Sequence, residues 1–473
     1  MSADRAGQLV GIDVGTSGAK VVLIDEKGAV LRSATRAYPM ATPAPGWTEQ
    51  DPEDWHRAVR ECLAELNAPK DAPTGFTGQM HGAVFLDERD RVIRPALLWN
   101  DQRTAAECRA IEETVGSERV RAVTGNAPVT SFQVPKLLWL RKHEPTQARQ
   151  VKSLLLPKDF VRLRLTGERM TDVADASGTG VFDVAKRDWS RELCELLDVD
   201  VRLFPAVKES GTAAGAGDQA AGAVGTGAVR EGIVSVSIGT SGVVFAALER
   251  MPSQRDDAVN LFCHATGGWH AMTVMLSAGG ALRWLRDVIY GAGTSYEAIM
   301  RDMEQVERAP EELVFLPYLA GERSPHIDPD ARGAFVGLSL HHTRAHLARA
   351  VVEGVTFGLR DGFEALRRVA GVVPSEVRVT GGGGRSTLWR QLLANVFGVP
   401  VVTLACEEGP AFGAAVLAGV RSGVWSRVTE ACDATVRVNE RTDPDGRNYD
   451  EAFARYRALY PSLSSFRALG MSS

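Results

Sequence analysis

The sequence predicts an α/β protein built from two similar lobes with a cleft between them. Its 473 residues are too many for one ordinary hydrophobic core, so two large domains are expected. Strand-like and helix-like runs alternate in both halves, which is typical of α/β sheets with mixed strand pairing. One short motif also occurs twice, because residues 12–18 read IDVGTSG and residues 236–242 read VSIGTSG.

Each copy of the motif lies between two strand-like runs and therefore predicts a β-hairpin with a glycine-rich turn. The runs are 8–14 and 20–24 in the first copy, and 233–238 and 243–248 in the second. Glycine reaches backbone conformations closed to other residues, so the amide groups of such a turn can converge on an anion. The second copy carries Ser237 where the first has Asp13, so the two halves are expected to share a scaffold but not a chemistry.

The other predicted elements follow the same alternation along the chain. A strand is expected over 376–380, and a third strand over 29–37 extends the first hairpin into a meander. Helices are expected over 52–66, 101–115, 133–143 (starting no earlier than Pro135), 158–165, 190–197, 278–290, 343–369, 386–397 and 410–421. A tract of small residues, 211–227, precedes the second hairpin, and its end gives the predicted division into lobes 1–228 and 229–473.

Composition excludes several classes of partner. The net charge of −5 gives no electrostatic case for nucleic acid or for an anionic membrane. The six cysteines include no C-x-x-C pair, which argues against zinc and disulfides and favours a reducing cytoplasm. The first residues lack the apolar core of a signal peptide, and no run is long and apolar enough to span a bilayer. We therefore expect a soluble, cytoplasmic protein.

The first hairpin combines Asp13 with the turn residues Gly15, Thr16, Ser17 and Gly18 and with Lys20 on the returning strand. A carboxylate at a strand end, beside amides that bind phosphate, is a natural seat for Mg²⁺. A lysine there can neutralise the charge of a phosphate in transfer. The plain alternative is a tight turn in which Asp13 only bonds its own backbone. The second copy of the turn, at 238–242, counts against that alternative.

Two glycine-rich stretches in other places suggest further parts of a site. Residues 381–386 lie between a predicted strand and helix, fit neither a Rossmann nor a P-loop pattern, and would let the backbone approach a nucleotide, with Ser386 capping the helix. Asp218 stands among residues too small to shield it, so its carboxylate could accept a proton from a hydroxyl. It could equally cap the helix predicted from Gln219, and the two roles are compatible.

Two polar loops suit a ligand with several hydroxyl groups. They are 79–82 (QMHG) and 98–101 (LWND), which offer amides and a carboxylate for hydroxyls and an aromatic face for C–H groups. Taken alone, Met80 reads as a core residue and His81 as a structural histidine. His341, His342 and His346 resemble metal ligands, but they lack a convincing acidic partner and are expected on the solvated surface.

Together these motifs resemble the FGGY carbohydrate kinases of the actin-like ATPase superfamily, from about residue 8 to about residue 420. The similar stretches are 78–82 (GQMHG), 98–101 (LWND), 135–139 (PKLLW), 156–159 (LPKD), 316–326 (LPYLAGERSPH) and 381–386 (GGGGRS). The resemblance implies a two-lobed, actin-like (ribonuclease H-like) fold with ATP and Mg²⁺ at the cleft. It implies phosphorylation of a sugar, and the motifs are most similar to those of members that convert D-xylulose to D-xylulose 5-phosphate. Similar kinases are commonly homodimers, so a homodimer is expected.

The resemblance also implies roles for single residues. Asp218 corresponds to the catalytic base and Asp13 to the carboxylate that orients Mg²⁺, with Asp218 as a second candidate metal ligand. The implied sugar contacts are Met80, His81, Trp99, Asn100, Asp101, Asp218 and Gln219. The implied ATP contacts are Gly15, Thr16, Ser17, Gly18, Lys20, Gly239, Thr240, Ser241, Gly279, Arg283, Gly382, Gly383 and Ser386.

The chain departs from the family pattern just before Asp218. Residues 204–212 run almost directly into 213–218, so a sheet strand with its connection is expected to be shortened or missing. A misplacement of ~1 Å can cost on the order of 100-fold in rate. Two alternatives therefore stay open: a kinase for another ketose or polyol, and a relative that binds nucleotide or sugar with impaired catalysis. A chaperone-type ATPase is disfavoured, because it would leave the loops 78–82 and 98–101 without a purpose.

Overall fold

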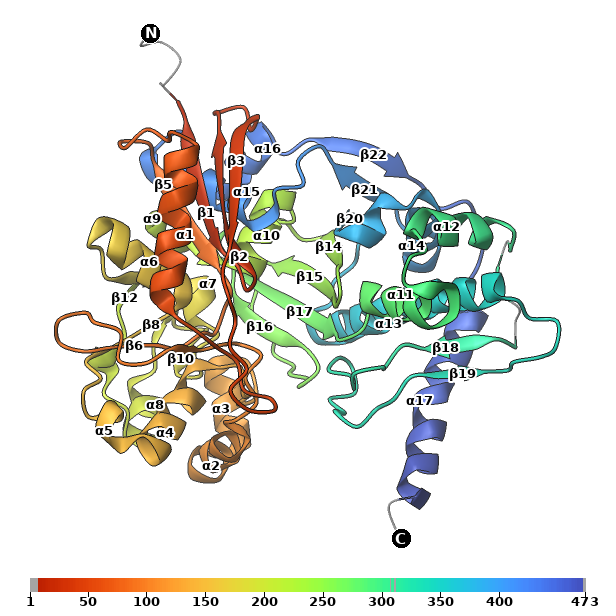
Figure 1. Cartoon of the computed structure of the whole chain (residues 1–473), viewed down its shortest axis with the longest axis horizontal. Helices are drawn as coiled ribbons and strands as arrows, with labels where there is room; N and C mark the ends of the chain where they lie inside the picture. The colour runs from red at the N-terminus through yellow and green to blue at the C-terminus, as the bar shows by residue number, and fades with distance from the viewer. Residues whose placement is uncertain (1–6, 307, 310–311, 471–473) are drawn as a thin grey trace.

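The computed structural model of the chain describes residues 7–306, 308–309 and 312–470. In Figure 1 the first lobe, coloured red to yellow, lies beside the second lobe, coloured green to blue. Each lobe is built on one mixed β-sheet, and the two sheets repeat the same order of a hairpin followed by two parallel strands. The predicted α/β duplication is confirmed.

The first sheet has five strands in the order β13-β5-β1-β2-β3. Its strands are β1 (Leu9–Val14), β2 (Gly18–Ile24), β3 (Val30–Ala37), β5 (Thr74–Gly78) and β13 (Gly215–Gly217). Strands β1, β2 and β3 form the predicted antiparallel meander, whereas β1, β5 and β13 run parallel. Because carboxyl ends of parallel strands meet at one edge, the residues that follow β1, β5 and β13 come together.

The second sheet has seven strands in the order β16-β17-β15-β14-β20-β21-β22. Its strands are β14 (Ile233–Ile238), β15 (Gly242–Leu248), β16 (Asn260–Cys263), β17 (Trp269–Met275), β20 (Glu376–Thr380), β21 (Val401–Leu404) and β22 (Val438–Thr442). Strands β14 and β15 form the second predicted hairpin, and β14, β20 and β21 run parallel. The sheet therefore gathers the hairpin turn and the glycine-rich residues after β20 at one edge.

Helices flank both sheets. The helices of the first half are α1 (Pro52–Glu65), α2 (Ala105–Val115), α3 (Ser117–Thr124), α4 (Gln133–His143), α5 (Pro145–Ala148), α6 (Pro157–Thr166), α7 (Val173–Ala176), α8 (Arg191–Leu196), α9 (Ser210–Ala213) and α10 (Asp218–Thr226). Those of the second half are α11 (Gly279–Leu285), α12 (Tyr296–Glu304), α13 (Arg344–Ala370), α14 (Thr387–Phe397), α15 (Gly409–Ser422), α16 (Val428–Thr435) and α17 (Asp450–Gly470). Single turns are η1 (Val201–Leu203), η2 (Arg286–Gly291) and η3 (Gly382–Arg385).

Short two-stranded pairs complete the fold. They are β4 (Glu49–Gln50) with β7 (Ala96–Leu97), β6 (Val84–Leu86) with β8 (Ser153–Leu155), β9 (Met170–Asp172) with β12 (Ala206–Lys208), β10 (Phe182–Asp183) with β11 (Asp188–Trp189), and β18 (Val314–Leu316) with β19 (Ala334–Val336). Among the described residues, no helix combines the length and the apolar character that crossing a membrane requires.

Each predicted helix corresponds to an observed one, with three differences at the ends. The helix predicted over 101–115 begins at Ala105, because the Asp101 side chain bonds the amide of Arg103 and turns the chain first. Helix α4 begins at Gln133, ahead of Pro135, since a proline in the first turn removes an N–H that has no partner within the helix. The helix predicted over 278–290 is α-helical to Leu285 and continues as the π-helical turn η2.

Helices α10 and α15 join the two lobes in one core. They cross closely, since a Cβ atom at Gly413 would lie 1.8 Å from the carbonyl oxygen of Ala221. Helix α15 also packs on the first sheet, where a Cβ at Gly11 would lie 1.9 Å from the carbonyl oxygen of Ala411. Residues of β1, β2, α10, α15 and α16 share one hydrophobic cluster. The division at residues 228 and 229 stays a prediction.

Candidate active site

The parallel strands of the first sheet bring Asp13 and Asp218 to one edge. Asp13, on β1, pairs with Thr77 on β5, and Gly217 at the end of β13 pairs with Gly78. Asp218 follows Gly217 directly, as the first residue of α10. The strand that leads to Asp218 is therefore present, although it is only three residues long. Gly217 occupies the N-cap position, so Asp218 is not the helix cap considered from the sequence.

The charge of Asp13 affects the protonation of Asp218. Burial raises the pKa of Asp13 to about 6, and Lys20 partly opposes that rise. Burial raises the pKa of Asp218 to about 7, and the negative charge of Asp13 adds to the rise. Two buried acids with raised pKa values, one of them raised further by the charge of the other, are typical of a functional site. A cation between them would lower both pKa values.

Asp13 has the features of a cation ligand. Its Oδ1 atom is buried and has no hydrogen-bond partner among the described residues. Oxygen ligands of this kind suit a hard divalent cation such as Mg²⁺. Residues Asp13 and Asp218 therefore fit the group that the sequence implied.

Asp218 faces a cavity of about 640 Å³ between the lobes. From the first lobe, α10 contributes Asp218 and Gln219 to its wall. From the second lobe, Ser237 on β14 and the glycines 381, 382 and 384 line the opposite side. The Asp218 carboxylate is thus directed into the space between the two duplicated sheets.

A second cavity, of about 680 Å³, lies in the second lobe. Seven of the residues predicted to contact ATP line it: Gly239, Thr240, Gly279, Arg283, Gly382, Gly383 and Ser386. Gly382 and Arg385 line both cavities, so the second cavity adjoins the space in front of Asp218. Ser386 caps α14 as predicted, accepting a hydrogen bond from the amide of Trp389 at 3.2 Å.

Helix α12 supplies lining residues that the sequence did not reveal. Tyr296, Met300 and Arg301 face the same cavity as the glycine-rich turns. An amphipathic helix looks the same whether its inner face covers a core or a cavity, so no local signal marked them.

The tip of the first hairpin is held by side chains far away in the sequence. The Gln50 amide donates to the carbonyl oxygen of Thr16 at 2.7 Å, and the Tyr38 hydroxyl donates to that of Gly15. The Trp99 indole donates to the Thr16 hydroxyl at 3.0 Å, which ties a predicted sugar loop to the hairpin. Neither Gln50 nor Tyr38 belongs to a motif, so sequence reasoning missed both.

Several residues predicted to contact ATP lie outside the walls of both cavities. Gly15, Thr16, Ser17, Gly18, Lys20 and Ser241 line neither of the two cavities. Lys20 forms an ion pair with Glu408, the N-cap residue of α15. Its charge is therefore partly neutralised across the lobe interface.

Met80 and His81 follow β5, next to the strand that carries Asp218. His81 is buried between Phe132 and Phe262, at ring distances of 5.1 and 6.1 Å. Burial lowers its pKa to about 3, and the charge of Lys136 adds to the shift, so the ring is neutral. Because Nδ1 lies 3.0 Å from the carbonyl oxygen of Gly178, it carries the proton. Nε2 is then an acceptor available to a hydroxyl group.

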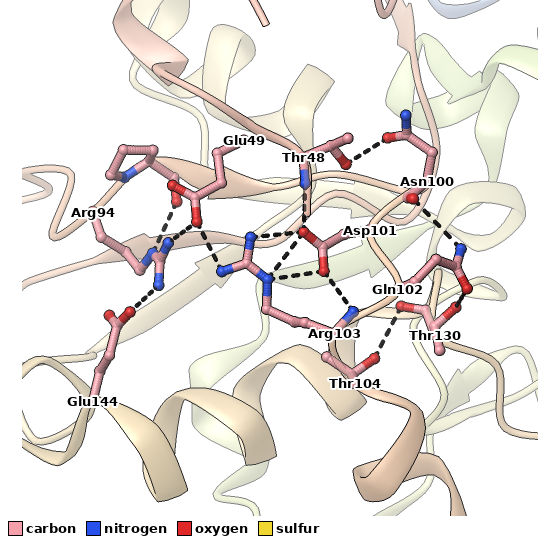
Figure 2. Close-up of polar contacts among 11 residues, drawn as sticks. Thr48, Glu49, Arg94, Asn100, Asp101, Gln102, Arg103, Thr104, Thr130 and Glu144 are labelled. Atoms are coloured by element: carbon pink, nitrogen blue, oxygen red, sulfur yellow. Dashed lines mark hydrogen bonds and ion pairs between the residues drawn. The ribbon is translucent and has the colours of Figure 1, made fainter. Parts of the chain in front are cut away.

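The carboxylate of Asp101 is bonded within the protein. Figure 2 shows its carboxylate facing the Arg103 guanidinium. The side chain is fully buried, Arg103 Nη2 lies at 2.7 Å, and the Thr48 amide donates to it at 2.7 Å. Both oxygens accept hydrogen bonds from the protein, and the predicted sugar contact of Asp101 stays a prediction. Of its neighbours, Asn100 accepts from the Thr48 hydroxyl, whereas Trp99 is 43% exposed.

The histidines near residue 341 do not form a suitable metal site. Ligand atoms of Glu312, His341 and His342 lie within 4.8 Å of one another. The amide of Ser339, however, donates to His342 Nδ1 at 3.1 Å. A neutral imidazole that accepts at Nδ1 carries its proton on Nε2 and has no lone pair left for a metal. The expectation of a solvated surface is wrong for His342, whose side chain is only 2% exposed.

Comparisons with known proteins show the family of the chain. Residues 8–248 match the N-terminal domain of the FGGY family of carbohydrate kinases, and residues 234–422 match its C-terminal domain. The xylulose kinase of Escherichia coli K12 is 40% identical over 486 residues, covering 97% of this chain and 98% of the relative.

Two solved structures show the same fold. One described as a xyloylose kinase from Brucella ovis is 38% identical, with a TM-score of 0.91 over 97% of this chain and 100% of that chain. A gluconate kinase from Lactobacillus acidophilus is 25% identical, with a TM-score of 0.88 over 98% of both chains. The fold is thus shared by kinases that are named for different substrates.

Proposed function

Because the chain belongs to the FGGY family of carbohydrate kinases, we propose that it phosphorylates D-xylulose with ATP in the cytoplasm, giving D-xylulose 5-phosphate and ADP. The observation that carries the proposal is the position of Asp218. Its carboxylate faces the space between the lobes, beside the residues that follow β5 and across from Ser237 and Gly381. One group there can reach both a bound sugar and the terminal phosphate of a nucleotide.

In the proposed reaction, Asp218 accepts the proton of the terminal sugar hydroxyl as its oxygen attacks the γ-phosphorus. The new O–P bond forms while the bond from the γ-phosphorus to the bridging oxygen breaks, and its electron pair leaves with ADP. A raised pKa of about 7 makes Asp218 a stronger proton acceptor than an ordinary carboxylate. Phosphoryl transfer otherwise relies mainly on positioning and on charge neutralisation.

The sugar is proposed to bind between the loop after β5 and the start of α10. His81 Nε2 accepts from one hydroxyl group, and Gln219 and Asn100 bind others. The exposed face of Trp99 packs on C–H groups. Met80 shapes the floor, since its side chain packs against Gly217.

The nucleotide is proposed to occupy the cavity of the second lobe, with its phosphates directed at Asp218. Asp13, with Asp218, would hold Mg²⁺, which supplies positive charge to the transferring phosphate. Amides and hydroxyls of the two hairpin turns are the expected phosphate donors. A homodimer in solution is also expected, and sedimentation analysis would test it.

An ADP-release assay with purified protein tests the proposal. D-xylulose, D-ribulose, L-ribulose, glycerol and gluconate are compared at equal concentration, with Asp218→Ala as the baseline. We expect kcat/KM for D-xylulose to exceed that for each of the other compounds by at least about tenfold. Turnover of D-xylulose should vanish when EDTA removes divalent cations. Turnover no higher than in Asp218→Ala would overturn kinase activity, and a different preferred sugar would overturn the substrate.

A further inference from the structure

The chain just before Asp218 has an unusual path. Helix α9 spans only Ser210–Ala213, and β13 begins two residues after it, at Gly215. Between them Ala214 has a positive φ of 49°, a conformation that costs free energy for a residue with a Cβ atom. Such a conformation persists only when surrounding contacts enforce it.

Arg162, on α6, supplies those contacts. Its side chain is fully buried. Its guanidinium donates to the carbonyl oxygen of Ala213 and, at 3.4 Å, to that of Ala214. The amide of Phe76 also donates to the carbonyl oxygen of Ala214, at 2.9 Å. The residue with positive φ is therefore held by β5 on one side and by Arg162 on the other.

The guanidinium also packs on the strand itself. It lies 4.7 Å from the ring centroid of Phe76, which pairs with Gly215 across β5 and β13. A Cβ atom at Gly215 would lie 2.6 Å from Arg162 Nη2, so the contact depends on a glycine there. Arg162 thus touches the chain from three to five residues before Asp218.

The other end of α9 is fixed by a buried group of charges. The Ser210 hydroxyl donates to Asp172 Oδ1 at 3.2 Å, and Lys158 Nζ lies 2.8 Å from Asp172 Oδ2. Lys158 and Asp172 are fully buried. With its start held by Asp172 and its end by Arg162, the short helix has little freedom to shift.

From these contacts we propose that Arg162 is a positioning residue for catalysis, which fixes β13 and hence the Asp218 carboxylate. The proposal rests on the proposed role of Asp218 as the base. Arg162 itself touches neither substrate nor nucleotide in this scheme. Its contacts lie where the chain departs from the family pattern, and they hold the short strand β13 in place.

The test compares Arg162→Met with a matched control, Arg164→Met. Arg164 lies on the same helix, packs 4.6 Å from the Phe160 ring, and bonds Glu53 and the carbonyl oxygen of Asp90, away from β13. We expect Arg162→Met to lower kcat by about 30- to 100-fold, the cost of a misplaced group. The KM for ATP should stay within about twofold, and Arg164→Met should keep kcat within about threefold.

Hydrogen–deuterium exchange gives a readout that does not depend on the substrate. Peptides covering 212–219 should exchange faster in Arg162→Met than in wild type or Arg164→Met, while peptides covering 381–386 should not change. Wild-type exchange over 212–219 in Arg162→Met, or equal kcat losses in the two variants, would overturn the proposal. If the wild type does not turn over D-xylulose, the proposed function fails, and exchange still decides whether Arg162 holds β13.

Arg162→Lys covers the case in which the methionine variant does not fold. Lysine keeps the charge but cannot donate through a planar fork to two carbonyl groups. We expect a folded protein whose melting temperature is within a few degrees of the wild-type value and whose kcat is lower than that of the wild type. An unchanged kcat with unchanged exchange over 212–219 would overturn the proposal.

Discussion

The two hairpins of this protein share a sequence motif and antiparallel pairing but differ in turn length and in charge. In the first, Asp13 pairs with Lys20 across β1 and β2; in the second, Ser237 pairs with Val243 across β14 and β15. The turns close differently, because Gly15 N bonds the carbonyl oxygen of Gly18, three residues on, at 3.1 Å, whereas Gly239 N bonds that of Ser241, two residues on, at 3.0 Å. The glycine-rich turn is therefore duplicated with a change in its closure, whereas the acidic and basic groups belong to the first hairpin alone.

The same contrast extends to the parallel strands beside each hairpin. In the first sheet β13 leads to Asp218, at the start of α10 and facing the cavity between the lobes. In the second sheet β21 leads to α15, whose N-cap residue Glu408 is paired with Lys20. An acid thus lies near the start of the helix in both lobes, but Asp218 faces the cavity whereas Glu408 is ion-paired with Lys20. The two lobes therefore share a fold, and they differ in the acidic and basic side chains at a few positions.

The largest expected effect on kcat comes from removing the carboxylate of Asp218. Asp218→Asn should lower kcat by about 1000-fold, within the range that a general base contributes, with both KM values changed less than about threefold. Glu408→Gln, at the corresponding helix start of the second sheet, should lower kcat by less than about fivefold. Steady-state kinetics of both variants measure the contrast. Similar losses of kcat in Asp218→Asn and Glu408→Gln would contradict the proposed difference between the two lobes.

A carboxylate placed in the second hairpin should weaken nucleotide binding. Ser237→Asp gives that hairpin the residue of the first, next to the expected phosphate position. Repulsion of like charges should raise the KM for ATP on the order of tenfold, which corresponds to about 1.4 kcal/mol. Ser237→Asn is the neutral control of nearly the same shape, and it should stay within about twofold. An equal rise in both would assign the effect to size rather than charge.

The smallest effect is a change in protonation. Asp13→Asn removes the negative charge that helps to raise the pKa of Asp218 to about 7. The ionised form of Asp218 is then less disfavoured, so its pKa should fall and its titration should move to lower pH. Carboxyl-carbon NMR of the nucleotide-free protein would measure the shift, with Ser237→Asn as a control that leaves it unchanged. An unchanged or higher pKa in Asp13→Asn would show that the two acids are not coupled.

Much of the fold could be predicted from the sequence because it depends on local pattern. The hairpins, the strand over 376–380 and the helices α1, α2, α4, α6, α8, α11, α13, α14 and α15 follow from hydrophobic periodicity, caps and glycine-rich turns. The repeat of one motif predicted the duplication, and the glycine-rich turns together with the family resemblance predicted seven residues that line the second-lobe cavity. These signals lie within a few residues of the structure they predict.

The tertiary structure alone decided which distant residues meet. Asp101, expected at a sugar, is bonded to Arg103 and to the amide of Thr48, which lies 53 residues away. Tyr296 and Met300 face a cavity only because α12 packs beside the turns of the second sheet. Arg162 reaches the carbonyl oxygens before Asp218 from 51 and 52 residues away. A sequence encodes the partners of a side chain through the whole packed fold, so such contacts carry no local signature.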